Sequence, residues 1–361
     1  MSRSTLEHNG LPGSTAGAPP RRPGSVRRTS NFDLFRPDGP YGRLEILGRA
    51  RDLFTGPGDE AVGRVLGTGM VSGTVIDNVV TRLVTHPSAP GTPGLVGRRA
   101  SVGWRTGVWR GLREHYDAGT PLHLLLDELP VGLIIAGYTY RRSKRDAEPA
   151  KGRSPGVCAG WAADSRAMRI FSQSGTPPAA VTPPNRPLAA PDDPIGWHTL
   201  PPLPVWGISR RRRMDVWRHH DRQDEPTGAD AGARSGRPDP TDGLGTPGGR
   251  GELAFDAMFR DVFRDDANEE FVLHEYGVTG RVGADGRVAS LRATPRVLPH
   301  RECPVSADSA PGLVGVPAAQ LRERVSMELF GPATCTHLND LLRFLADVTA
   351  LAAAVPAPAD R

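Results

Sequence analysis

The feature of this sequence that most constrains its fold is a segment that occurs twice in the same order. The first copy opens at Gly42 with GRLEILGRARDLF, and the second opens at Gly251 with GELAFDAMFRDVF. Each copy continues with a run rich in Val and Gly, then the pentapeptide PGLVG, then a His followed by several Leu residues. Because the order is kept and the spacing nearly so, the sequence predicts an internal duplication in which two related units pack together as a pseudo-dimer.

The second copy has the clearer periodicity and predicts strands followed by helices. GADGR at 283–287 is a tight-turn signal between two β-rich runs. The final helix carries apolar residues at helical spacing, which gives it one face that packs against a sheet. The expected elements are strands at about 251–263, 271–283 and 287–297, a helix near 317–329, and a final helix from about 335.

The first copy predicts a similar unit. Hairpins are expected within Val62–Val84, and an amphipathic helix over 108–116. Pro121 is expected to open a short helix that Pro130 ends, and 131–140 is expected to be a buried strand. The predicted fold class is therefore α+β, with two pseudo-repeated units, each a small antiparallel sheet covered by helices, and long disordered loops.

Composition adds linkers and loops to this scheme. Hydrophobic residues make up 38% of the 361 residues, and the chain contains 43 Gly and 36 Pro, so much of it cannot belong to a core. The predicted organisation is a disordered tail at 1–26, a first, degenerate unit at 27–140, a Pro-rich connector at 141–209, a second unit at 210–355 with a disordered loop at 218–250, and a tail at 356–361.

Charge and cysteine content limit the classes of partner. The net charge is +5, but Arg replaces Lys almost throughout, so we interpret the dense run Arg210 to Arg213 as a solvated face rather than a nucleic-acid surface. We find no apolar run of about 18 residues and no apolar leader, so neither a membrane span nor a secretory signal is expected. Three cysteines are a poor disulfide framework, which favours a reduced, cytoplasmic protein. No protein partner is indicated.

We expect the chemistry of this protein to be carried by a cluster of Cys and His that occurs in the second copy alone. Cys303 follows the third predicted strand, and Cys335 and His337 stand at the start of the last helix. A thiol at a helix N-terminus is expected to favour the thiolate, which is a soft metal ligand. Two sulfurs and an imidazole supply three of the four ligands of a zinc or iron site. The fourth is expected from Asp265, with Asp266, His274 and His300 as the other choices.

Two other interpretations of these residues stay open. The cysteines can be inert, buried hydrophobes in a non-catalytic binding module whose apolar pocket lies between the two units. Alternatively, Cys335 can be the nucleophile of a thiol-dependent enzyme with His337 as its base. Cys158, in the connector, is expected to be packed rather than reactive. His274 and Glu275 are neighbours in a strand, so their side chains are expected to face opposite sides.

The motifs HEYGV, RVLPHRECP and TCTHLNDLLRFLADV, together with RRTSNFDLFRPDG and CAGWAAD, resemble a bacterial family of unknown function, domain of unknown function 2889. This resemblance places Cys303, Cys335 and His337 inside the family's motif and implies no activity or cofactor. The order of three strands, a Cys, helices and a Cys that opens the last helix is also similar to the layout of iron–sulfur cluster assembly scaffolds. Those scaffolds have a further Cys in the first turn, where this chain has Asp265 and Asp266.

Overall fold

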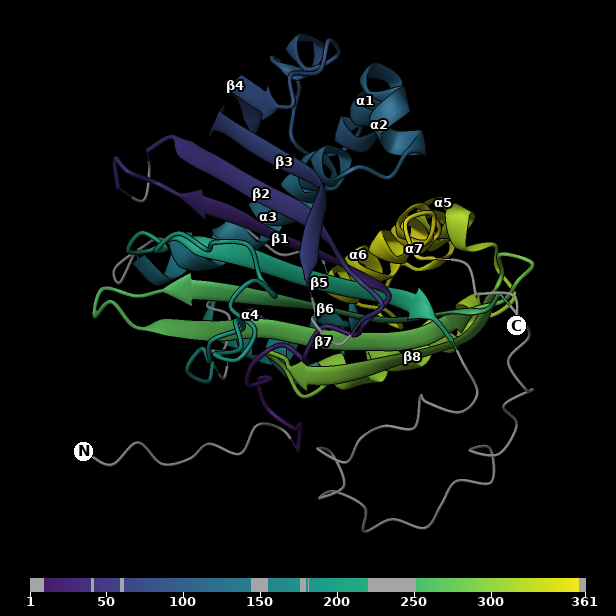
Figure 1. Cartoon of the computed structure of the whole chain (residues 1–361). Coiled ribbons are helices and arrows are strands. Elements are labelled where there is room, and N and C mark those ends of the chain that lie inside the picture. The colour runs from purple at the N-terminus through teal and green to yellow at the C-terminus, as the bar shows by residue number, and fades with distance from the viewer. Residues whose placement is uncertain are drawn as a thin grey trace, which may run out of the picture.

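A computed structural model describes residues 10–39, 42–58, 62–143, 155–175, 180, 182–219 and 251–356. Within these residues one eight-stranded antiparallel sheet runs through the whole molecule, in the order β4-β3-β2-β1-β5-β6-β7-β8 (Figure 1). The strands are β1 (Ser25–Phe35), β2 (Leu44–Thr55), β3 (Gly63–Ile76), β4 (Val79–His86), β5 (Ile208–Arg218), β6 (Leu253–Arg264), β7 (Glu270–Val282) and β8 (Val288–Val297). The fold is therefore α+β, as the sequence predicts.

The two halves of the sheet are joined edge to edge by the pairing of β1 with β5. These strands pair in antiparallel register from Ser25 opposite Trp217 to Leu34 opposite Ile208. Both are buried along nearly their whole length, because other elements cover both faces of the sheet at its centre. Each half contributes four strands in mirrored order, but descent of the halves from one duplicated segment stays a prediction.

Helices cover one face of the sheet. They are α1 (Trp104–Gly111), α2 (Arg113–Asp117), α3 (Pro121–Ser143), α4 (Arg166–Ser174), α5 (Leu321–Glu328), α6 (Thr336–Phe344) and α7 (Val348–Ala352), with short 3-10 turns η1 (Pro93–Leu95), η2 (Ala159–Trp161), η4 (Cys303–Leu313), η5 (Ala318–Gln320) and η6 (Leu345–Asp347). Helix α3 packs on β1, β2 and β3, whereas α6 packs on β6 and β7 and α7 packs on β5. Helix α4 belongs to the connector and contacts η2.

Helix α3 corrects the prediction that Pro130 ends a helix and that a strand follows. The helix continues through Pro130 to Ser143. An internal Pro costs roughly 3 kcal/mol, so tertiary packing must supply the difference. Gly132 shows how close that packing is, because a Cβ built there would lie 3.1 Å from the ring of Phe32 on β1.

The uninterrupted helix also changes the expectation about membranes. By length and composition the window Pro121–Tyr138 of α3 is long and apolar enough to cross a membrane, and 67% of this window is buried inside the protein. A core helix passes the same test, and the contacts of α3 with three strands are those of a core helix.

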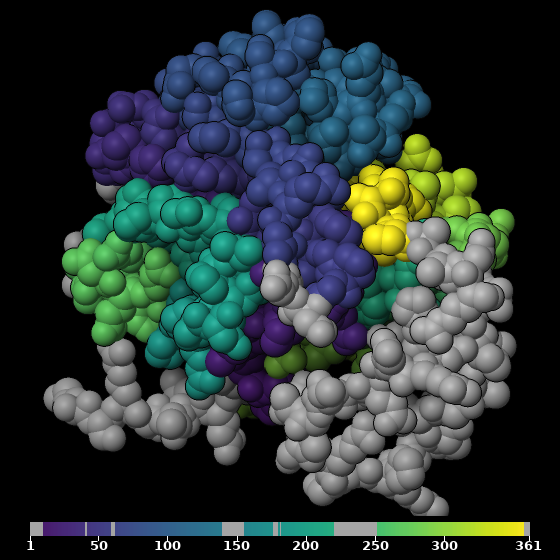
Figure 2. All heavy atoms as spheres, viewed as in Figure 1, coloured from purple at the N-terminus to yellow at the C-terminus, as the bar shows by residue number. Residues whose placement is uncertain are grey.

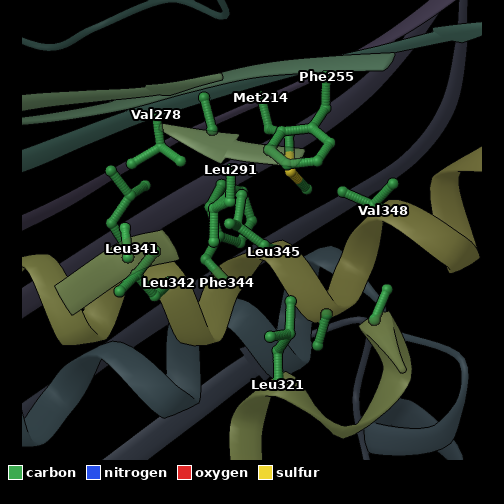
Figure 3. Packing of buried hydrophobic residues seen from close by; sticks show 14 of the residues in the cluster. Met214, Phe255, Val278, Leu291, Leu321, Leu341, Leu342, Phe344, Leu345 and Val348 are labelled. Carbon is green, nitrogen blue, oxygen red and sulfur yellow. The ribbon is translucent and has the colours of Figure 1, made fainter. Parts of the chain in front are cut away.

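The core of the second half forms where α6, η6 and α7 lie against the sheet. Figure 3 shows Leu341, Leu345 and Val348 directed toward side chains of β5 to β8, including Met214 and Val278. Leu341 and Val348 are fully buried, as is Met214. The predicted apolar stripe of the last helix therefore packs on the sheet as expected, and it fixes the start of α6 close to β6 and β7.

The opposite face of the sheet is covered by the N-terminal segment and part of the connector, and purple and teal atoms of these ranges are visible near the centre of Figure 2. Thr15 donates its backbone N–H to the Glu275 carboxylate over 2.8 Å, and Ala18 is buried. His198 contacts Thr29 of β1 over 2.8 Å. Residues 10–24 therefore differ from the disordered tail that their composition predicts, because they bond to the sheet. Residues 1–9, 220–250 and 357–361 lie outside the described residues, so the disorder predicted there stays a prediction.

Candidate functional site

A cluster of ligand-type side chains lies between the sheet and the start of α6. Asp261 on β6 and His274 on β7 stand directly opposite each other in the strand register. His337 from α6 lies over them, and one potential ligand atom from each of the three residues lies within 4.8 Å of the others. The rings of His274 and His337 stack with centroids 3.9 Å apart and planes inclined by 21°.

Strand alternation explains how these side chains come together. Asp261 and His274 face the helices, whereas their chain neighbours Arg260 and Glu275 face the other side of the sheet. Arg260 donates from Nε to Glu275 over 2.7 Å there, and both side chains are completely buried. The expectation that His274 and Glu275 point in opposite directions is confirmed, and each has a partner on its own face.

Asp261 is held as a carboxylate that orients His274. Arg210 donates to both carboxylate oxygens, from Nε over 2.7 Å and from Nη2 over 2.8 Å. Burial alone would raise the pKa of Asp261, but the charge and hydrogen bonds of Arg210, followed by those of His274, hold this pKa well below its usual range. The ionised carboxylate lies 3.0 Å from Nδ1 of His274. A proton on Nδ1 that points to Asp261 leaves Nε2 of His274 available as an acceptor or a metal ligand.

Cys335 and His337 meet at the helix start, as the sequence predicts. Cys335 is the N-cap residue of α6, and its Sγ lies 3.9 Å from Nδ1 of His337. Zinc–sulfur bonds of about 2.3 Å and zinc–nitrogen bonds of about 2.0 Å, at a tetrahedral angle, place the two ligand atoms about 3.5 Å apart. The observed separation therefore allows one ion to bind both side chains after a small movement.

The protonation state of Cys335 differs from the expectation. Burial raises the pKa of this thiol to about 11, although the backbone N–H groups of Leu338 and His337 lower it. The expectation that the helix start favours a thiolate is thus wrong for Cys335, because the loss of water outweighs the two N–H groups. A reactive thiolate is disfavoured here unless a cation compensates its charge.

The other two predicted ligands are Cys303 and Asp265. Cys303 opens η4, is 6% exposed, and shares an apolar cluster with Cys335. Asp265 lies four positions beyond Asp261, about 13 Å along the strand direction. There its carboxylate accepts the backbone N–H groups of the β6–β7 turn, from Ala267 over 2.9 Å and Glu269 over 3.0 Å. In the part of the chain that the structure describes, Asp261 rather than Asp265 is the carboxylate beside the histidines.

The basic run Arg210 to Arg213 is buried in the centre of the sheet, so the prediction of a solvated face is wrong. Its four side chains are 1 to 6% exposed. Arg210 bridges Asp261 and Asp340, and Arg212 forms ion pairs with Glu128 and Asp340. These guanidinium groups are committed to carboxylates inside the protein and cannot reach a phosphate backbone.

A cavity lies at the junction of the two halves, between α3 and the last helices. It has a volume of about 10 Å³, enough for one water-sized sphere. Eight of the ten lining residues are ionisable, namely His123, Asp127, Glu128, Arg212, Arg322, Asp340, Arg343 and Asp347. This cavity is small and charged, unlike the large apolar cleft that a binding pocket between the units requires.

The fold and the site define a mixed α+β protein with imidazole, thiol and carboxylate groups clustered in its second half. Residues 240–351 match the model of the family described as protein of unknown function (DUF2889), and the HEYGV, HRECP and TCTHLNDLL motifs lie within this segment. No curated protein and no solved structure matches the chain. The similarity in layout to iron–sulfur scaffolds is not supported by these comparisons.

Proposed function

We propose that this protein binds one transition-metal ion, zinc or iron, at the start of α6. Cys335 and His337 hold the ion, and the flanking donors are His274 on the sheet side and Cys303 on the other. Asp261 orients His274 without binding the ion itself, because both of its oxygens accept hydrogen bonds from Arg210. The observation that carries this proposal is the convergence of His337 on both Cys335 and the Asp261–His274 pair.

The chemistry of the donors supports a borderline-soft ion. Imidazole nitrogen and thiolate sulfur together favour zinc, or iron, over magnesium and calcium, which prefer oxygen ligands. A buried Asp that fixes a His ring in one tautomer is the usual support of a metal-binding imidazole. The raised pKa of Cys335 fits the same proposal, since a bound cation supplies the positive charge that the thiolate lacks.

Metal analysis of the purified protein tests the proposal. We expect about one zinc or iron ion per chain, and we expect Cys335→Ser and His337→Ala to lose it. His86→Ala is the matched control, because His86 is exposed on β4 at the far edge of the sheet. Substoichiometric metal in the unmodified protein after reconstitution, or an unchanged content in Cys335→Ser, would end the proposal.

The second candidate function is a non-catalytic binding module with structural cysteines. The burial of Cys303 and Cys335 in one apolar cluster favours it. It predicts no metal after reconstitution and a loss of unfolding free energy in Cys335→Ser, measured by chemical denaturation. The charged junction cavity does not support a hydrophobic ligand for such a module.

A further inference from the structure

The connector carries a short segment, residues 156–161, that lies over the two cysteine motifs, and this segment contains Cys158. Ala159 donates its backbone N–H to the carbonyl of Thr334 over 2.9 Å, directly before Cys335. Gly156 in turn donates to the carbonyl of Trp161 over 2.7 Å, which closes the segment into a compact loop. The third cysteine of the chain is thereby anchored next to the start of α6.

The same loop also lies in close contact with Cys303. A Cβ built on Gly160 would lie 2.7 Å from Sγ of Cys303 and 3.0 Å from the ring of His300, so only glycine fits this position without a shift. Trp161 is 7% exposed and meets the His300 ring edge to face at 5.2 Å. Arg166, at the start of α4, donates its backbone N–H to the Glu302 carboxylate over 2.6 Å. The hydrogen bonds of Ala159 and Arg166 thus hold the loop in place on both sides of its contact with Cys303.

All three cysteines of the chain therefore gather at one place, although they come from three separate segments. The hydroxyl of Tyr276 donates to the carbonyl of Cys303 over 3.2 Å from beneath them. The electrostatics agree with this geometry, because burial first, and then the charges of Cys335 and Cys158, raise the pKa of Cys303 well above its ordinary value.

We propose that Cys158, Cys303 and Cys335, with His337, form a closed three-thiol, one-imidazole site for a thiophilic ion such as Zn²⁺, Cd²⁺ or Co²⁺. This inference rests on the proposed function and specifies its ligand set: His274 then stacks on His337 instead of binding, and the connector loop supplies a ligand. Three sulfurs and one nitrogen make a tetrahedral set of the structural kind. Among the described residues, Asp261, His274 and His337 form the one set of three or more whose ligand atoms all lie within 4.8 Å of one another, so the ion must draw the three sulfur atoms together.

Binding of Co²⁺ tests the site, because thiolate-to-cobalt charge-transfer absorbance reports the number of sulfur ligands. The full chain is reduced, freed of metal and titrated with Co²⁺. In Cys158→Ser we expect this absorbance to fall by about a third at saturation, since one of three sulfurs is lost. His86→Ala, the exposed control on β4, is expected to keep the full absorbance, and circular dichroism verifies that each variant is folded.

The outcomes separate this inference from the proposed function. A wild-type spectrum in Cys158→Ser, together with lost binding in His337→Ala, overturns the three-thiol site and leaves the metal site standing. Loss of binding in His274→Gln, with a band too weak for three sulfurs in the unmodified protein, also overturns it. An unmodified protein that binds neither Co²⁺, Zn²⁺ nor iron overturns both proposals.

Discussion

Replacement of Glu128 by Gln should make the protein more stable at pH 8 while leaving its stability at pH 4.5 unchanged. Glu128 lies on α3 at the junction of the two halves and is 3% exposed. Its Oε1 forms an ion pair with Arg212, whereas Oε2 has no hydrogen-bond partner among the described residues. Burial raises the pKa of this carboxyl from 4.5 to about 7, against the attraction of Arg212 and with the help of the nearby charge of Asp340.

The magnitude follows from the linkage between proton binding and folding. The folded protein binds the Glu128 proton more tightly than the unfolded chain does, so the stability that this proton supplies is present below pH 4.5. It is lost as the pH rises from 4.5 to about 7, and the loss amounts to about 3 kcal/mol at 1.36 kcal/mol per pKa unit. Gln keeps the shape of the protonated carboxyl and has no charge to bury. The difference in unfolding free energy between Glu128→Gln and the unmodified protein should therefore rise from near zero to about 3 kcal/mol.

Chemical denaturation at several pH values between 4.5 and 8 measures this difference directly. The difference is more informative than either curve alone, because the contributions of the other titrating groups are common to both proteins and cancel in the comparison. Asp127→Asn is the matched control on the same helix. Arg105 and Arg343 hold the pKa of Asp127 well below its usual range against the effect of burial, so this variant should lose stability at pH 7. A difference for Glu128→Gln that stays flat from pH 4.5 to 8, or that falls, would refute the reasoning.

Three further changes test other parts of the structure. Burial lowers the pKa of His198 to about 4, so His198 adds stability as the pH rises from 4 to 6.5. In denaturation curves measured at several pH values, His198→Asn should flatten this rise in unfolding free energy. A slope equal to that of the unmodified protein contradicts this expectation. Leu345→Ala should cost roughly 2 to 5 kcal/mol of unfolding free energy, because Leu345 is 1% exposed in the core of Figure 3; a cost below 1 kcal/mol would mean that α6 and η6 are not packed as described. Gly160→Ala should weaken Co²⁺ binding, because the new Cβ displaces the connector loop from Cys303. Gly94→Ala is the control and should bind Co²⁺ normally, because no atom lies within 4 Å of its new Cβ. Equal Co²⁺ affinities of the two variants would argue against the loop contact.

The local pattern of apolar and polar residues was sufficient to predict a helix or strand wherever one face of the element is apolar and the other is polar. The three strands after residue 250, the turn at Gly286 and the helix that starts at Cys335 lie close to their predicted positions. The juxtaposition of Cys335 and His337 could also be predicted, because it depends only on the start of one helix. The prediction that the helix ends at Pro130 was wrong, because an internal Pro that would end an isolated helix is tolerated where α3 packs against the sheet.

The site itself depends on contacts between distant segments. Asp261 was missed because its partner His274 is set by the register of β6 on β7, although a lone acid on an apolar strand face could have drawn attention to it. The prediction that the run of arginines is solvated was wrong, because the sequence alone does not show whether carboxylates from other elements will pair with these guanidinium groups. Arg210, for example, contacts acids on β6 and α6.

The sequence by itself thus determined the α+β class, most elements of the second half, and the pairing of a thiol with an imidazole at one helix start. These features depend on periodicity, caps and turns, which act over a few neighbouring residues. Only the tertiary structure decided that Asp261 lies beside the histidines, that four arginines are internal, and that the connector loop lies against Cys303 at Gly160. The physical reason is that strand register and the position of the connector are fixed by packing and ion pairing across the whole sheet, and no local pattern records either of them.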